Sequence, residues 1–72
     1  MASSCPGRGK KLWPELLGVD GKDAARMIEN QNKMVDAIIV DKDDGLVQNF
    51  DCNRVWVKVD KHGIVAEVPR VG

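Results

Sequence analysis

The sequence lacks the residues on which most enzyme sites are built. Serine occurs no later than Ser4 and threonine is absent, so serine chemistry has no nucleophile within the fold. The single histidine, His62, and the two cysteines, Cys5 and Cys52, form neither a zinc pattern nor a Cys–His pair with a third orienting group. No glycine-rich phosphate loop lies between a strand and a helix. We therefore expect a protein that is not an enzyme and that uses no metal or other cofactor.

The chain also lacks a net charge, a long apolar run and an apolar leader. Its 11 basic and 11 acidic residues cancel, whereas nucleic-acid binding favours a basic excess on one face. No run approaches the ~20 apolar residues of a membrane span, and no signal peptide is seen. We expect neither a nucleic acid nor a membrane as a partner. A cytoplasmic and an extracellular or vacuolar location both stay open.

The composition is enough for one small domain, residues 1–72. Hydrophobic residues make up 43% of the chain and charged residues 31%, as in ordinary globular proteins. A core of this size is marginal, so a covalent link would help to hold the fold. Cys5 and Cys52 are either two free thiols or one disulfide, which would contribute about 4 kcal/mol in the chain-entropy model.

Hydrophobic periodicity predicts one helix and three strands. Asp20 is the expected N-cap of a helix over residues 21–31. The expected strands are 34–40, 55–60 and 64–68, with a turn around Gly63 before the last. The expected core side chains are Trp13, Leu16, Leu17, Ala24, Met27, Ile28, Val55, Val57 and Val59.

The fold class that follows is α+β, with one helix packed on a small mixed β-sheet. The first two strands are joined by a long connection and not by a tight turn, which favours parallel pairing. The continuous run Ile38-Ile39-Val40 is typical of an inner strand covered on both faces. Residues 1–11 are expected to be a flexible N-terminal arm.

The long connection between the two inner strands is the best candidate for a functional segment. Loops of roughly a dozen residues are uncommon in compact domains, and they are usually functional or disordered. Leu46, Val47 and Phe50 make this one apolar, and Cys52 and Arg54 stand at its downstream end. An exposed apolar segment that is fastened at one end suggests presentation to a partner.

Four stretches together resemble a known family. They are Trp13-Pro14-Glu15-Leu16-Leu17-Gly18, Ile38-Ile39-Val40, Cys52-Asn53-Arg54-Val55 and the terminal Val68-Pro69-Arg70-Val71-Gly72. Their order and spacing resemble the potato inhibitor I family of plant serine-protease inhibitors over nearly the whole chain. The resemblance implies a protease inhibitor of plant defence and the wound response. It also implies the single-disulfide branch, with Cys5 bonded to Cys52, and we expect a monomer.

The resemblance implies a reactive-site loop over residues 43–52, which enters a protease like a substrate. The reactive bond would be Gln48–Asn49, with Gln48 as P1, the residue that fills the primary specificity pocket. Further protease contacts would come from Gly45, Leu46, Val47, Phe50 and Asp51. The loop would be supported from below by Arg54, Trp56, Arg70 and Gly72.

Three positions depart from the family pattern, and they affect the expected target. Trp56 stands where arginine is common, Val47 where threonine is frequent, and Asn49 where an acidic residue is frequent. Gln48 is a poor match for trypsin, which wants a basic P1. We expect subtilisin-like proteases first, chymotrypsin-like proteases second and trypsin as an unlikely target. A non-inhibitory interaction or storage protein on the same scaffold, and a small thiol-regulated protein, are the alternatives.

Overall fold

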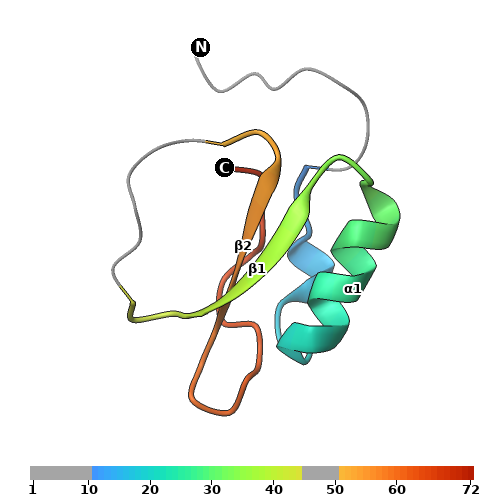
Figure 1. The fold of residues 1–72 in the computed structure, drawn as a ribbon. Coiled ribbons are helices and arrows are strands. Elements are labelled where there is room, and N and C mark those ends of the chain that lie inside the picture. The colour runs from blue at the N-terminus through green and yellow to red at the C-terminus, as the bar shows by residue number, and fades with distance from the viewer. Residues whose placement is uncertain (1–10, 45–50) are drawn as a thin grey trace.

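The computed structural model describes residues 11–44 and 51–72 of the chain. The 3₁₀ helix η1 (Pro14–Leu16) is followed by the α-helix α1 (Gly21–Gln31), and then by the strands β1 (Asp36–Asp41) and β2 (Arg54–Val59) (Figure 1). The predicted helix is confirmed, and the first two predicted strands lie within two residues of their expected bounds. Within 11–44 and 51–72, no helix is long and apolar enough to cross a membrane.

Helix α1 begins where the sequence predicts it. The carboxylate of Asp20 accepts a hydrogen bond from the backbone N–H of Lys22 at 2.9 Å, which satisfies one of the open amides of the first turn. Gly21 is required by packing, because a Cβ atom there would lie 2.7 Å from Cγ1 of Val59. Ala24 and Ile28, one turn apart, are fully buried against the sheet. The start of the helix is therefore pressed directly onto the end of β2.

Two predicted core residues near and on the helix are exposed. Met27 is 45% exposed, because it lies at the margin of the apolar stripe on which Ala24 and Ile28 are central. Leu17 is 51% exposed, since it follows η1 while Leu16 turns into the core. Both were wrongly predicted to be buried. The other predicted core residues are buried, so the prediction was wrong only at the margin of the core.

Strands β1 and β2 pair in parallel, with Asp36 opposite Arg54 and Asp41 opposite Val59. This confirms the predicted parallel arrangement of the strands that flank the long connection. Isolated antiparallel bridges extend the sheet and make it mixed. They join Leu12 to Arg70, Asp20 to Ile64, Val55 to Val71 and Val59 to Val65.

The predicted third strand over 64–68 is wrong, because these residues divide their hydrogen bonds between two partners. The N–H of Val65 donates to the carbonyl of Val19 at 2.8 Å, while the N–H of Ala66 donates to the carbonyl of Lys58 at 2.8 Å. No continuous ladder with β2 results. The predicted turn before it is confirmed by Gly63, whose φ of 80° suits glycine.

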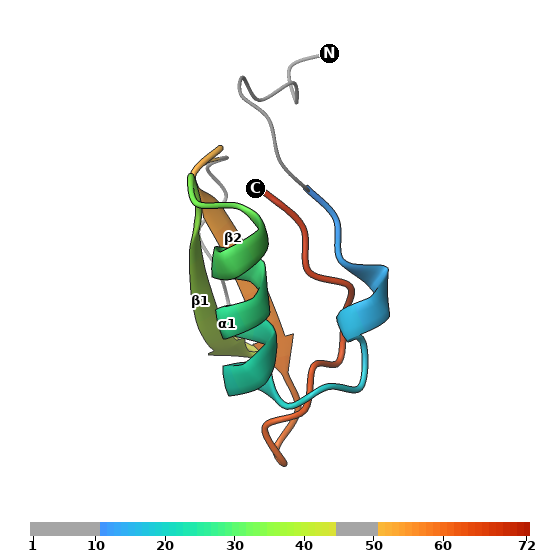
Figure 2. The same ribbon diagram turned by 90° about the vertical axis from the view of Figure 1, so that its right-hand side faces the viewer.

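The core lies between α1 and the sheet, which α1 covers on one face (Figure 2). Trp13 is fully buried; its backbone N–H donates to the carbonyl of Pro69 at 3.0 Å and its indole Nε1 to Oε1 of Gln31 at 2.9 Å. The buried apolar side chains are Trp13, Leu16, Ala24, Ile28, Val35, Val55, Val57, Val59 and Val65.

The run Ile38-Ile39-Val40 is not covered on both faces as predicted. Ile38 is 40% exposed and Ile39 is 43% exposed. The physical reason is the place of β1 in the sheet. Within the described part of the chain β1 pairs with β2 alone, so it is an edge strand.

Candidate functional site

The segment between β1 and β2 is described at its two feet, residues 42–44 and 51–53. The predicted reactive bond Gln48–Asn49 lies outside the described residues, and so do Gly45, Leu46, Val47 and Phe50. Because β1 and β2 are parallel, the segment leaves from the far end of one strand and returns to the near end of the other (Figure 1). The feet are therefore separated by the length of the strand pair.

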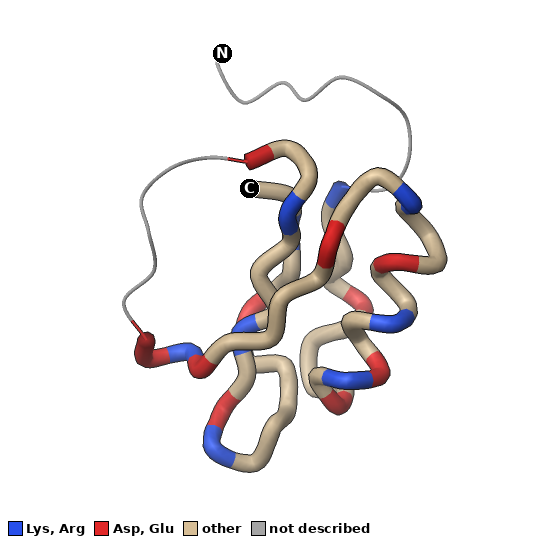
Figure 3. Tube along the Cα trace, in the orientation of Figure 1, with Lys and Arg blue, Asp and Glu red and all other residues tan. Residues whose placement is uncertain are grey.

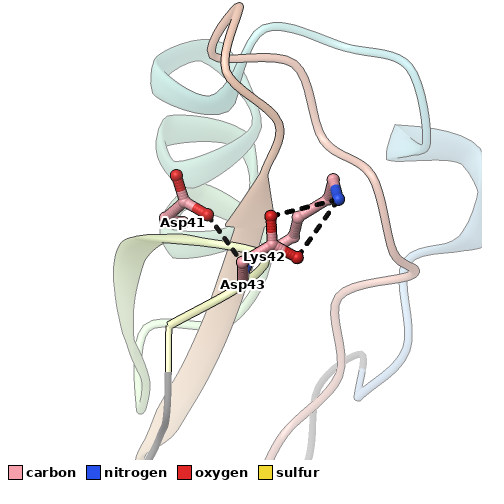
Figure 4. Close-up of polar contacts among 3 residues, drawn as sticks. All are labelled: Asp41, Lys42 and Asp43. Carbon is pink, nitrogen blue, oxygen red and sulfur yellow. Dashed lines mark hydrogen bonds and ion pairs between the residues drawn. The ribbon is translucent and has the colours of Figure 1, made fainter.

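The upstream foot is organised by Asp41. Its Oδ1 accepts a hydrogen bond from the N–H of Asp43 at 2.8 Å, and its carbonyl accepts one from the N–H of Asp44 at 3.0 Å. Lys42 Nζ lies 3.3 Å from Oδ1 of Asp43 (Figure 4). The foot is a side-chain-capped turn that ends β1, and this explains the clustered aspartates without a bound cation.

The downstream foot is also a side-chain-capped turn, and Asp51 supplies its cap. Its Oδ1 accepts from the N–H of Asn53 at 2.8 Å, and its carbonyl accepts from the N–H of Arg54 at 3.3 Å. Asn53 then fastens this turn to the start of β1. Its Nδ2 donates to the carbonyl of Met34 at 2.8 Å, and its own carbonyl accepts from the N–H of Asp36 at 2.8 Å.

Both feet are acidic. Figure 3 shows aspartates on either side of residues 45–50: Asp43 and Asp44 upstream, and Asp51 downstream. The nearest described basic side chain after the segment is Arg54, the first residue of β2. On the downstream side the charge changes from negative at Asp51 to positive at Arg54, three residues later.

Arg54 is the centre of a small cluster formed by three of the predicted support residues. The side chain is buried, with 9% of the residue exposed, and its Nε donates to the carbonyl of Gly72 at 2.9 Å. Gly72 in turn donates its N–H to the carbonyl of Arg54 at 2.9 Å. The guanidinium carbon lies 4.5 Å from the centre of the Trp56 ring, which is a cation–π contact. Arg54, Trp56 and Gly72 thus hold one another at the downstream foot.

Arg70, the fourth predicted support residue, is brought to the same face by the antiparallel bridges. It is exposed and lines a hollow of about 660 Å³ beside Trp56 and Gly72. Lys58 and Glu67 form an ion pair of 3.4 Å on the wall of this hollow. Among the described residues, the hollow is lined by Trp56, Lys58, Glu67, Val68, Arg70, Val71 and Gly72.

Cys52 lies within the downstream turn, between Asp51 and Asn53, and is disulfide-bonded. Its expected partner Cys5 lies outside the described residues.

Asp60 has a shifted pKa, and it belongs to a turn away from these feet. The pKa of Asp60 is lowered, mainly because its carboxylate accepts a hydrogen bond from the N–H of Ile64 and also from that of His62. These hydrogen bonds order residues 60–64. In residues 11–44 and 51–72, no group of His, Cys, Asp and Glu side chains is arranged to hold a metal ion.

The sequence analysis predicted Arg54, Trp56, Arg70 and Gly72 as support residues, which stays a prediction, and it did not single out Asn53. The side chain of Asn53 ties the downstream turn to the carbonyl of Met34, two residues before β1. The pattern Asp51-x-Asn53 indicates the turn, since an aspartate side chain can cap the amide two residues later, but it does not indicate the bond to Met34.

Comparisons with known proteins agree with this arrangement. The family model described as Potato inhibitor I family matches residues 6–72. The chain is 46% identical over 70 residues to "Inhibitor of trypsin and hageman factor" from Cucurbita maxima, covering 97% of this chain and 100% of that one. It is 46% identical over 70 residues to "Trypsin/subtilisin inhibitor" from Amaranthus caudatus, covering 97% and 99%. The crystal structure of bitter gourd trypsin inhibitor superposes with a TM-score of 0.89 at 42% identity, covering 90% of this chain and 96% of that one.

Proposed function

The chain belongs to the potato inhibitor I family, whose members are protease inhibitors and not enzymes, and from this premise we propose that it inhibits a serine protease by inserting residues 43–52 like a substrate. The observation that carries the proposal is the pair of fixed feet. Each end of the segment is a turn capped by an aspartate, and the two turns are attached to strands that pair with each other.

Fixed feet matter because inhibition requires a substrate that binds but is hydrolysed slowly. An extended segment adds main-chain hydrogen bonds along the protease cleft, while alternate side chains enter its pockets. A segment ordered in advance loses little conformational entropy on binding, so affinity rises. After cleavage, ends that stay in place can rejoin. The turns at Asp41 and Asp51 restrict both ends in this way.

Within this proposal the reactive bond is Gln48–Asn49. Gln48 occupies the primary pocket as P1, and Val47 and Leu46 precede it as P2 and P3. Asn49 and Phe50 follow as P1′ and P2′, with Gly45 and Asp51 completing the contact region. The assignment rests on the family pattern, in which the bond lies at a fixed distance before Arg54.

The support for the loop rests on Arg54. Its guanidinium is positioned by Gly72 and by the Trp56 ring, at the point where β2 begins. We propose that the guanidinium also bonds to residues around the reactive bond, while Trp56, in a position where arginine is common in the family, orients it. Arg70 and Gly72 complete the support from the neighbouring strand.

The covalent part of the support is a Cys5–Cys52 disulfide. Cys52 is disulfide-bonded, and Cys5 is the only other cysteine in the sequence. The bond would tie the N-terminal arm to the downstream foot. Reduction should therefore raise the inhibition constant and speed cleavage of the loop before it unfolds the domain.

The preferred target class follows from Gln48. Trypsin pairs a buried carboxylate with a basic P1, which glutamine cannot supply, and chymotrypsin favours a large apolar P1. Subtilisin-type proteases gain affinity from several subsites and tolerate more P1 residues. We therefore propose the order subtilisin-like, chymotrypsin-like, trypsin. Relatives named for trypsin, and one for both trypsin and subtilisin, show that the scaffold serves more than one class.

A second candidate function is a non-inhibitory interaction or storage role. Trp56 favours it, because the indole cannot supply the second guanidinium that the family commonly places under the loop. Under this reading the feet and the support cluster hold a segment that no longer fits a protease.

The test is an inhibition assay against subtilisin, chymotrypsin and trypsin. The proposal expects inhibition of subtilisin, with cleavage products that end at Gln48 and begin at Asn49. Gln48→Lys should gain trypsin inhibition by at least about 100-fold, since a basic P1 pairs the carboxylate of that pocket. Gln48→Glu is the matched control and should gain none. No inhibition of any of the three at micromolar inhibitor would favour the second candidate.

A further inference from the structure

Within residues 11–44 and 51–72, the outer edge of β1 pairs with no other strand and has the geometry of a strand-pairing surface. The N–H of Asp36 donates to the carbonyl of Asn53 at 2.8 Å, and the N–H of Lys42 donates to the carbonyl of Val59 at 2.8 Å. The even-numbered amides of this strand therefore face β2. Because strand amides alternate in direction, those of Ala37, Ile39 and Asp41 face away from it.

The described surroundings of this edge leave most of its length accessible. In Figure 2, β1 forms the left boundary of the described structure, and α1 covers the sheet without extending past the strand. One outward amide is engaged, since the N–H of Ala37 donates to Oε2 of Glu29 on α1 at 2.9 Å. Beside the edge, Ile38 and Ile39 are 40% and 43% exposed. Such an edge is a template for another strand.

We propose that the partner is a second copy of this chain, paired antiparallel through β1 with Ile39 opposite Ile39. In this register the N–H of Ile39 donates to the carbonyl of Ile39 in the other copy, and the reverse. The N–H of Asp41 donates to the carbonyl of Ala37 in the other copy, again twice by symmetry. The result is a continuous sheet with β1 of each copy at its centre.

This register leaves one hydrogen bond per copy unformed, because its donor and its acceptor already have partners within the chain. A full ladder would also bond the N–H of Ala37 to the carbonyl of Asp41 in the other copy. Glu29 accepts from that N–H, and the carbonyl of Asp41 accepts from the N–H of Asp44. In this register the carbonyl of Asp41 in the other copy approaches the N–H of Ala37, so the Glu29 carboxylate has to move aside when the two copies pair.

Charge selects this register over its neighbours. On the face away from α1, Asp36 stands opposite Lys42 of the other copy, and Ile38 stands opposite Val40. The two-fold symmetry repeats each pair, which gives two opposite-charge pairs around an apolar centre. A shift that centres the pairing between Ile38 and Ile39 would place Asp36 opposite Asp41 and would turn the wrong amides toward the partner.

Lys42 can supply its charge at little cost. Its ammonium pairs with Asp43 at 3.3 Å in a contact whose side chains are 42% and 80% exposed, and such exposed pairs are weak. A contact made by one short strand per copy is small, so the dimer belongs to the weak, reversible class of interfaces. The pairing does not depend on the proposed inhibition, because none of its contacts involves residues 45–50.

The experiment is sedimentation equilibrium of the whole 72-residue chain from about 0.01 to about 2 mM, the range in which weak association is measurable. Asp36→Lys and Lys42→Asp should each raise the dimer dissociation constant at least about tenfold, by placing like charges opposite one another. The double variant, which exchanges the two charges, should return to within about threefold of the native value. Asp23→Lys and Lys61→Asp, the same charge changes elsewhere, should have no comparable effect.

A second variant tests the hydrogen bonds. Ile39→Pro removes an N–H that faces away from β2, so it should abolish the dimer and keep the intramolecular ladder, as checked by the amide NMR spectrum. If that variant does not fold, the charge exchange alone decides. A chain that stays monomeric to about 2 mM, a folded Ile39→Pro variant that still dimerises, or a charge exchange that does not restore association would overturn the proposal.

Discussion

The two faces of β2 differ as strongly as any two regions of this molecule. Val55, Val57 and Val59 point into the core and are at most 8% exposed. Arg54, Trp56 and Lys58 alternate with them and form the base of the downstream foot and the wall of the hollow. One strand thus packs into the core with one face and carries on the other the side chains that we propose support the binding segment. Because the alternation has a period of two, the two roles can be changed separately by mutation.

The largest effect is expected on the inner face. Val57→Ala removes two methyl groups from a fully buried position and should lower the free energy of unfolding by about 2–3 kcal/mol. Chemical denaturation measures this loss. The inhibition constant of the folded protein should stay within about twofold of native, since β2 still presents Arg54 and Trp56. A large change in the inhibition constant of the folded Val57→Ala protein would show that the two faces of β2 are coupled.

The next effect is expected at Arg54. Arg54→Ala should raise the inhibition constant about 30-fold and speed cleavage of the Gln48–Asn49 bond, because the segment loses its positioned guanidinium. The free energy of unfolding should fall by only about 1–2 kcal/mol, from the lost bond to Gly72 and the lost contact with Trp56. Arg54→Lys keeps the charge but loses Nε. Its inhibition constant should lie between those of the native protein and Arg54→Ala. If stability collapses while the folded fraction inhibits normally, Arg54 belongs to the core and not to the support.

A smaller effect is expected at Trp56. Trp56→Leu keeps an apolar side chain but removes the ring face beneath the guanidinium, and should raise the inhibition constant about three- to tenfold. Trp56→Phe retains a ring and is the matched control, with a change of less than about threefold. Equal losses in the two variants would mean that bulk, and not the cation–π contact, orients Arg54.

The smallest effect is expected from Asp60, which stands beyond the end of β2 and serves neither face. The pKa of Asp60 is lowered in the folded protein, so its contribution to stability is present above its unfolded pKa and is lost as the pH falls through the folded value. Asp60→Asn should flatten this part of the acid-side stability profile and leave inhibition at neutral pH unchanged. Denaturation midpoints measured across the acid range compare the two proteins, and superimposable profiles would contradict the prediction.

Much of the arrangement around β2 could be predicted from the sequence, because it depends on local pattern. The valine alternation indicated the buried face, the Asp20 cap and the apolar stripe indicated α1, and the length of the connection indicated parallel strands. Arg54, Trp56 and Gly72 were expected to act together, and the structure brings them into contact.

The parts that could not be predicted depend on which neighbour an element finds. The segment 64–68 reads as a strand, yet Val65 and Ala66 bond to different partners, so no ladder forms. The run at Ile38 and Ile39 reads as an inner strand, yet its second neighbour is missing within the described part of the chain. The role of Asn53 depends on a carbonyl from another element, which no pattern in its own segment indicates.

Trp13 lies in the core that the inner face of β2 borders, and Trp56 lies on the outer face of β2, so the molecule contains its own pair of optical reporters. Trp13 is fully buried and donates its indole N–H to Gln31, so its fluorescence should be blue-shifted and should follow global unfolding. Trp56 is half-buried under a guanidinium at the downstream foot, so its longer-wavelength emission should respond when that foot is disturbed. The emission wavelength that changes should therefore distinguish a ligand that binds residues 43–52 from a denaturant that unfolds the core, without any added label.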